Sequence, residues 1–458
     1  MRFEPKVVKP QAPQIFMGLR ICHAFWVCDL TRLQNAARVS FTYRSILCLF
    51  CLSSTYAESV IFIHPDGAGA AHWQAARFLL VGPDGELNWD KLPHVGIYRG
   101  HMANSLTATS NGGATSHAYG IKVAANSFGT DGERAGRPIA ASGFRGSLMQ
   151  EAMEKKIRVG VVNSGSVIEP GTACFLSSVP KRDDYEEITK QVLESGADVI
   201  LSGGEEWFLP KGKAGRFVQS GARTDGLDLI DAAIKRGFTV VYDREELLAV
   251  PAGTRKLLGV FAFEDTFNDM SQSDLKASNL PTYKQGAPTL ADMTRAALAV
   301  LGGEPFFLVV EEEGADNFGN ANNAIGTFDA LMHSDQAFGT ALDFVKTHPE
   351  TLLITAADSV AGNFDVIGFV PSPEKIVAFS VGRDLNGAPL GLAANGMPFL
   401  SQPDKRGVRH PFVVSWGTLQ DSSGGILVRA AGKNAEAVKG SFDNTQIYEV
   451  MRRTLFEP

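Results

Sequence analysis

The chain has 458 residues, of which 44% are hydrophobic and 20% are charged, a composition typical of a soluble globular enzyme with a large core. Its formal net charge is −7 and it has no concentrated Lys/Arg tract, so we expect no nucleic-acid binding. Four of its five cysteines lie in the first 51 residues and only Cys174 follows, which excludes a disulfide framework in the body of the chain.

The first 57 residues differ in character from the rest. Arg44 precedes the short apolar run 45–52, and small residues follow it up to Ala57. A positive charge, a short apolar segment and a small-residue end form the pattern of a secretory signal peptide, and the run is too short to span a bilayer. We therefore predict that residues 1–57 are a leader and signal peptide. The mature protein would then be periplasmic or extracellular, without a transmembrane anchor; the alternative is a cytosolic protein with an amphipathic arm.

From residue 58 onward, apolar strands alternate with helical segments. This alternation predicts an α/β fold with a large, mostly parallel sheet covered by helices on both faces. Residues 364–415 contain six prolines and break the rhythm, so we interpret them as an insertion of loops and short strands. The predicted strands are 58–64, 158–163, 198–201, 239–242, 257–263, 305–310, 351–355 and 425–429. One predicted helix ends near residue 80 and another begins near residue 111. The other predicted helices span about 185–195, 227–236, 289–301, 320–346 and 444–456.

Acidic residues follow several of the predicted strands. Asp66 follows the first strand, the stretch 311–316 follows the strand 305–310, and Asp358 follows the strand 351–355. The carboxyl ends of parallel strands meet at one edge of a sheet, where ligands bind. Carboxylates that lie close together repel, and metal ions are the usual counter-charge. An acidic run alone is also typical of a solvated loop.

A helix rich in small residues begins beside Ser110. Small side chains let a ligand approach the backbone, and a helix N-terminus favours an anion. Serine is also a common N-cap that needs no catalytic role. Together with the acids and with Arg182, however, an activated hydroxyl suits in-line phosphoryl or sulfuryl transfer assisted by two metal ions.

These motifs resemble those of the alkaline phosphatase family, in the same chain order. The run from Asp66 to Gly69 is similar to the family's first metal-binding motif, and Thr109-Ser110 is similar to the start of its nucleophile helix. The resemblance runs from about residue 58 to the C-terminus, and it implies one domain, 58–458, with a crown-like insertion near 364–415. Further similar segments are 169–183, 197–204, Glu311 with Asp316, and 355–358.

The resemblance implies metal-dependent hydrolysis of phosphate monoesters through a phosphoseryl intermediate. Small-molecule phosphate esters would be the substrates, and a homodimer is the expected assembly. Ser110 would be the nucleophile, with Thr109 as the alternative, and Arg182 would bind the phosphoryl group together with Thr109. The implied metal ligands are Asp66, Glu169, Thr172, Glu311, Asp316, Asn320, Asp358, Ser359 and Asp421.

The chain departs from the family at its zinc-binding histidines. The corresponding positions are Asn320, Ser359 and Asp421, so the candidate ligands are nearly all oxygen atoms. Oxygen ligands suit Mg²⁺, Ca²⁺ or Mn²⁺ better than Zn²⁺. We therefore expect Mg²⁺, with Ca²⁺ or Mn²⁺ as alternatives and Zn²⁺ less favoured. Among the histidines we retain only His64, two residues before Asp66, as a neighbour of the site.

The position of one metal ligand stays open, and so do two alternative functions. The family's magnesium-site threonine falls at Gly171 or, with a shift of one residue, at Thr172. The chain could be a phosphodiesterase or sulfatase of the same superfamily, although Ser110-Asn-Gly lacks the Cys/Ser-x-Pro-x-Arg motif of sulfatases. It could also be a non-catalytic phosphate- or cation-binding relative, against which the retained Ser110, Arg182 and acids argue.

Overall fold

The computed structural model describes residues 58–131, 137–368, 382–383, 387 and 389–457. The predicted leader and signal peptide lie outside these residues and stay a prediction. Within the described ranges, no helix combines the length and the apolar character that crossing a bilayer would need.

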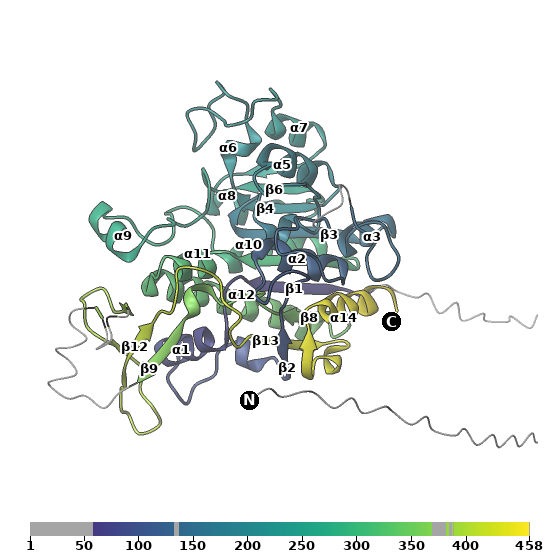
Figure 1. Ribbon diagram of the computed structural model, residues 1–458. Helices are drawn as coiled ribbons and strands as arrows, with labels where there is room; N and C mark the ends of the chain where they lie inside the picture. The colour runs from purple at the N-terminus through teal and green to yellow at the C-terminus, as the bar shows by residue number, and fades with distance from the viewer. Residues whose placement is uncertain (1–57, 132–136, 369–381, 384–386, 388, 458) are drawn as a thin grey trace, which may run out of the picture. The chain divides into compact units, whose positions relative to one another are not determined.

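A ten-stranded sheet forms the centre of the fold (Figure 1). Its strands are β1 (Val60–Pro65), β2 (His94–Arg99), β3 (Arg158–Ser166), β4 (Val199–Gly203), β5 (Thr239–Val241), β6 (Leu257–Val260), β7 (Phe306–Glu312), β8 (Leu352–Thr355), β13 (Leu427–Gly432) and β14 (Gly440–Asp443). They lie in the order β14-β2-β13-β8-β1-β7-β3-β4-β6-β5. Within this sheet of described strands, β13 alone runs antiparallel to its neighbours. The predicted large, mostly parallel sheet is confirmed.

Side chains alternate between the two faces of the sheet along each strand, so both faces carry apolar side chains, and helices cover both of them. In β1, Val60 and Phe62 pack into one core layer, whereas Ile61 and Ile63 pack into the other. The first layer includes α2 (Ser110–Tyr119), α3 (Leu148–Glu154), α4 (Pro170–Ala173), α5 (Tyr185–Glu194), α6 (Glu205–Phe208), α7 (Leu229–Lys235) and α14 (Thr445–Phe456). The second includes α1 (Ala70–Leu80), α8 (Arg244–Leu248), α9 (Gln272–Ser278), α10 (Leu290–Leu301), α11 (Gly314–Asn320) and α12 (Ala324–Thr347).

The helix predicted at about 320–346 is confirmed as α12, which begins at Ala324, but a separate short helix, α11, precedes it and was not predicted. Asn322 adopts a left-handed backbone with φ of 53°, which breaks the first helix. Asn323 then caps α12, its side-chain oxygen accepting a hydrogen bond from the Gly326 N–H at 2.9 Å. The preceding strand, β7, is longer than predicted and continues through Glu312, so Glu311 lies inside the sheet rather than in the following loop.

The predicted insertion holds a second, smaller sheet. Its strands are β9 (Asp365–Gly368), β10 (Leu390–Gly391), β11 (Phe399–Leu400) and β12 (Pro411–Ser415), and β12 pairs antiparallel with the other three. Phe412 of β12 packs edge-on against Phe78 of α1, with ring centroids 6.0 Å apart. The small sheet therefore extends the core beside α1 (Figure 1).

Candidate metal centre

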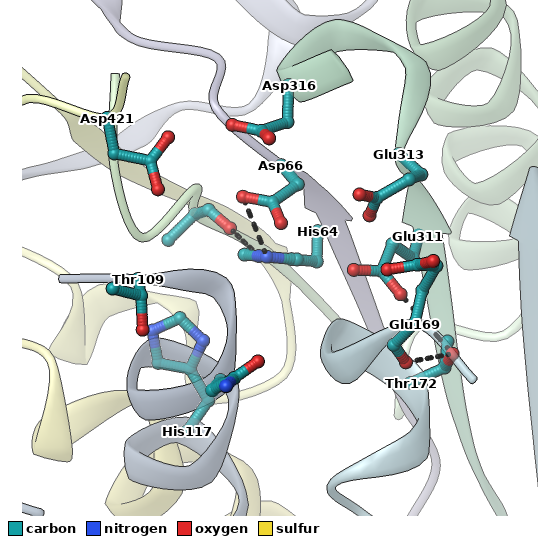
Figure 2. A network of polar contacts seen from close by, with 12 residues as sticks. His64, Asp66, Thr109, His117, Glu169, Thr172, Glu311, Glu313, Asp316 and Asp421 are labelled. Carbon is teal, nitrogen blue, oxygen red and sulfur yellow. Dashed lines mark hydrogen bonds and ion pairs between the residues drawn. The ribbon is translucent and has the colours of Figure 1, made fainter. Parts of the chain in front are cut away.

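Four adjacent parallel strands, β8, β1, β7 and β3, bring acidic side chains to one edge of the sheet. Asp66 follows β1, Glu311 lies near the end of β7, and Asp358 and Glu169 lie in the segments after β8 and β3. Figure 2 shows the carboxyl groups of Glu311, Glu313 and Asp316 arranged around Asp66. The structure thus brings together the acids that the strand ends predict.

Asp66 belongs to two groups of side chains that could each hold a cation. Its ligand atoms lie within 4.8 Å of those of His64 and Asp358 in one group, and of those of Glu311 and Glu313 in the other. Asp66 is fully buried, and within the described part of the chain neither of its carboxylate oxygens has a hydrogen-bond partner. This position makes Asp66 the shared member of a paired centre.

Burial and mutual repulsion oppose ionisation of Glu311 and Asp358, whereas contact with His64 outweighs burial and lowers the pKa of Asp66. Burial, followed by the charges of Asp66 and Glu169, raises the pKa of Glu311 to about 8 against the opposing charge of His64. Burial and the charge of Asp66 also hold the pKa of Asp358 well above its usual range. A divalent cation favours the ionised forms instead. Buried carboxylate oxygens without partners are the donors that hard divalent cations take, so this donor set fits such cations.

Thr172, rather than Gly171, supplies a hydroxyl beside Glu311. The Thr172 hydroxyl lies 3.3 Å from Glu311 Oε2, to which the amide of Asn163 also donates. Gly171 approaches the same carboxyl so closely that an added Cβ would lie 1.9 Å from Glu311 Oε1. A side chain at position 171 would displace the acid, which favours the match shifted by one residue.

The three consecutive acids of β7 and its end do not share one role. Glu312 turns away from the edge and accepts hydrogen bonds from the hydroxyls of Tyr283 at 2.6 Å and Ser164 at 2.7 Å. Burial raises the pKa of Glu312 to about 7. The carboxyl group of Glu313, which was not among the predicted ligands, lies beside that of Glu311. The two-residue period of a strand could have identified it.

A further group of acids lies between α11 and the loop before β13. The Asn320 amide nitrogen lies 3.2 and 3.1 Å from the two carboxylate oxygens of Asp316, and it donates to Asp421 Oδ1 at 3.0 Å. The Gly362 N–H donates to the Asn320 oxygen at 2.9 Å, and because an N–H can only donate, this contact fixes the direction of the amide. Asn320 therefore links the two acids through its N–H group. Burial raises the pKa of Asp421, and the contacts with Asp316, Asn320 and the buried Ser359 oppose this rise only in part.

The two candidate nucleophiles have different surroundings. Thr109 is the N-cap of α2: its hydroxyl accepts from the Gly112 N–H at 3.4 Å and donates to the carbonyl of Ala125. Ser110, the first residue of α2, is only 5% exposed. Burial raises the pKa of Asp66, but the contacts with His64, with Asp358 and with the nearby Ser110 hydroxyl outweigh burial and lower it. The structure therefore commits the Thr109 hydroxyl to the cap and directs Ser110 toward the acids.

Arg182 lies beside the start of α2. One guanidinium nitrogen contacts Glu169 Oε2 at 2.9 Å and another donates to Asn111 Oδ1 at 3.2 Å. Its side chain remains 43% exposed, so an anion from solvent can reach it. Glu169 is thus paired with Arg182, while Glu311 and Glu313 lie nearer to Asp66.

His64 lies inside the centre rather than merely beside it (Figure 2). It is fully buried, and its Nε2 lies 3.6 Å from Asp66 Oδ1. Burial lowers the pKa of His64, but the contact with Asp66 and the charges of Asp66, Asp358 and Glu311 outweigh burial and raise it to about 10. The sequence spacing from Asp66 indicated a neighbour, but not the direction of its ring.

Comparisons with known proteins agree with this arrangement. Residues 57–456 match the family model for alkaline phosphatase. Alkaline phosphatase H of Pseudomonas aeruginosa is 26% identical over 445 residues, which cover 88% of this chain and 86% of that protein. Alkaline phosphatase of Escherichia fergusonii is 25% identical over 469 residues, covering 93% and 92%.

Two solved structures share the fold. Thermus thermophilus alkaline phosphatase superposes with a TM-score of 0.66 at 22% identity, covering 88% of this chain and 92% of that one. The alkaline phosphatase of the Antarctic bacterium TAB5 superposes with a TM-score of 0.65 at 22% identity, covering 87% and 98%. A variant of the Antarctic protein was solved with magnesium bound.

Proposed function

Because the chain belongs to the alkaline phosphatase family, we propose that it hydrolyses phosphate monoesters with the help of divalent cations. The observation that carries this proposal is the convergence around Asp66, next to the hydroxyl of Ser110, of buried carboxylates with oxygens that have no partner among the described residues. Acids that hold cations, an activated hydroxyl and an arginine are the parts that in-line phosphoryl transfer requires.

Each of these side chains has a distinct task in the proposed reaction. Bound cations would neutralise phosphoryl charge and lower the pKa of a nearby hydroxyl. Asp66 and Asp358 would hold a cation beside Ser110. The Ser110 oxygen attacks phosphorus as the bond from phosphorus to the ester oxygen breaks, and the leaving oxygen takes up the proton that Ser110 loses. Water then attacks the phosphoseryl intermediate, releasing inorganic phosphate and restoring Ser110. Arg182 binds phosphoryl oxygens through its planar guanidinium.

The remaining acids support two further cation positions. Asp316 and Asp421 would hold a cation facing the leaving group, with Asn320 orienting both carboxyl groups and Ser359 lying beside them. Glu311 with Thr172, and Glu313 as an addition, would hold a third cation that shares Asp66. Glu169 borders this position and orients Arg182.

An assay of the purified protein tests this function and its cation preference together. After chelation, Mg²⁺, Ca²⁺, Mn²⁺ or Zn²⁺ is restored singly and the protein is offered an aryl phosphate, an aryl phosphate diester and an aryl sulfate. We expect hydrolysis of the monoester, restored by Mg²⁺, Ca²⁺ or Mn²⁺ more than by Zn²⁺, because most of the donors are oxygen atoms. A double variant in which Asn320 and Ser359 are each replaced by histidine should shift the cation preference toward Zn²⁺.

Three results of this assay would contradict parts of the proposal. Faster cleavage of the diester or the sulfate would favour the other hydrolases of the superfamily. No cleavage with any cation would favour a non-catalytic, cation-binding relative. Full activity restored by Zn²⁺ alone in the unmodified protein would contradict the oxygen-based preference.

We further propose that the protein is exported and that its mature chain begins near Glu58. The signal-peptide pattern at 44–57 supports this, and Glu58 already belongs to the fold, since its carboxylate pairs with Lys433 at 2.8 Å. Mass spectrometry of periplasmic or secreted material should find an N-terminus near residue 58. A cytosolic protein that retains the first 57 residues would contradict export.

A further inference from the structure

The orientation of the His64 ring is fixed by the strand next to it. Its Nδ1 lies 2.8 Å from the backbone oxygen of Ala356, and because a carbonyl can only accept, this nitrogen carries a hydrogen. Nε2 then points to the opposite side. It is buried, and within the described residues it has no hydrogen-bond partner. The ring therefore presents an uncommitted nitrogen to the carboxyl groups of Asp66 and Asp358.

The spacing of these three side chains suits one cation. Nε2 lies 3.6 Å from Asp66 Oδ1, which is too long for a hydrogen bond. Donors that each lie about 2.0–2.2 Å from one cation are separated from each other by roughly 3–3.5 Å, close to this distance. Both carboxylate oxygens of Asp358 are also buried and have no hydrogen-bond partner in the described part of the chain. Three buried groups thus direct uncommitted donor atoms into one small volume.

The contact with Ala356 is also the contact that metal-binding histidines make. A histidine that binds a metal through one nitrogen commonly donates its other N–H to a carbonyl, which fixes the tautomer and the ring. Ala356 lies in the same segment after β8 as Asp358, and β8 pairs directly with β1, which carries His64. One segment therefore supplies both the orienting carbonyl and a second ligand.

We propose that His64 is a metal ligand, whose Nε2 joins Asp66 and Asp358 around one divalent transition-metal cation beside Ser110. Imidazole suits transition-metal cations better than Mg²⁺ or Ca²⁺, whereas carboxylates suit Mn²⁺ as well as Mg²⁺. Of the cations expected to restore activity, Mn²⁺ therefore fits this mixed position best. The centre is then mixed, with one nitrogen-containing position and oxygen-only positions at Glu311 and Asp316. The cation's part in catalysis rests on the proposed function, whereas its binding does not.

The competing role of His64 is that of a fixed positive charge. In that case Nε2 carries a second hydrogen, pairs with Asp66 and leaves no lone pair for a metal. The two roles differ in a property that can be measured without turnover, which is direct coordination of nitrogen to a bound cation.

Electron spin-echo measurements on the Mn²⁺-loaded full chain separate these roles. We expect the wild-type spectrum to show ¹⁴N coupling from a coordinated imidazole, and His64→Gln to lose it together with at least a tenfold loss of Mn²⁺ affinity. The matched control is His72→Gln. His72 is equally buried but caps α1, accepting from the Gly69 N–H at 3.2 Å and stacking on Phe364. This variant should keep the coupling.

Several outcomes would overturn the inference. Absence of nitrogen coupling in the wild-type protein does so without any variant, and so does coupling that persists in a folded His64→Gln protein. If that variant does not fold, the same spectra of His72→Gln and His117→Gln decide: coupling kept in both supports His64, and coupling lost in either identifies another ligand. His117 is the ring next to His64, with centroids 5.6 Å apart.

Failure of this inference differs from failure of the proposed function. If the protein cleaves no phosphate ester, but its nitrogen coupling is present in the wild type and absent in His64→Gln, then His64 is a metal ligand and the proposed enzymatic function is wrong. If the protein cleaves the aryl phosphate but shows no nitrogen coupling, then only the assignment of His64 as a ligand is wrong.

Discussion

Replacing Ser110 with alanine is expected to abolish hydrolysis of an aryl phosphate while leaving the fold intact. The neighbouring Thr109 hydroxyl does not take its place, because it is engaged in capping α2. Loss of the nucleophile in a covalent mechanism costs about 10⁵–10⁶-fold in turnover, or roughly 7–8 kcal/mol. The measurement is kcat on the cation-loaded protein, with circular dichroism to verify folding.

Ser116→Ala is the matched control for this experiment. Ser116 lies in the same helix and is fully buried, and its hydroxyl has no hydrogen-bond partner among the described residues. The Ser116→Ala protein should turn over substrate at close to the wild-type rate. If Ser110→Ala retained that rate instead, Ser110 would not be the nucleophile, and Thr109 would be the next residue to replace.

Replacing Asp66 with asparagine is expected to have the second-largest effect. Asp66 is the one acid common to both cation groups, so its loss removes a ligand from each of them. Outer-sphere partners of metal ligands typically account for 10–100-fold, and a shared direct ligand should account for on the order of 10³-fold or more in kcat/KM. We also expect a lower number of bound cations, measured by elemental analysis after gel filtration.

Glu312→Gln is the control for Asp66→Asn. Glu312 is also a fully buried acid at the same sheet edge, yet it faces Tyr283 and Ser164 rather than the cation groups. A glutamine can still accept from both hydroxyls, so cation content and turnover should stay close to wild type. Equal losses in the two variants would indicate a general effect of removing buried charge, and full cation content in Asp66→Asn would exclude it as a shared ligand.

The parts of the fold that could be predicted are those set by long apolar runs. β1 and β7 lie in the middle of the sheet, buried on both faces, and their sequences are therefore almost continuously apolar. β2 was not predicted, because it lies next to the edge strand and only alternate side chains are buried, with Val95 and Ile97 exposed. The break between α11 and α12 also escaped the apolar pattern, since one left-handed asparagine, Asn322, produces it.

The acids of the candidate site could be predicted for a similar reason. A parallel sheet must bring its strand ends together, so the positions of Asp66, Glu311 and Asp358 followed from the order of strands and helices alone. The direction of each side chain did not follow. The amide of Asn320 is turned by the Gly362 N–H, and the ring of His64 is turned by the Ala356 carbonyl. Both contacts join segments that are far apart in the sequence.

The position of β1 in the sheet also has a consequence for how the protein folds. β1 is the first strand of the described residues, yet its neighbours β7 and β8 come late, and His64 is 292 positions from the Ala356 oxygen that it contacts. During synthesis the apolar run Val60–Ile63 must therefore wait, unpaired, for most of the chain. Such distant pairings slow folding and expose the incomplete chain to aggregation, which calls for protection by chaperones.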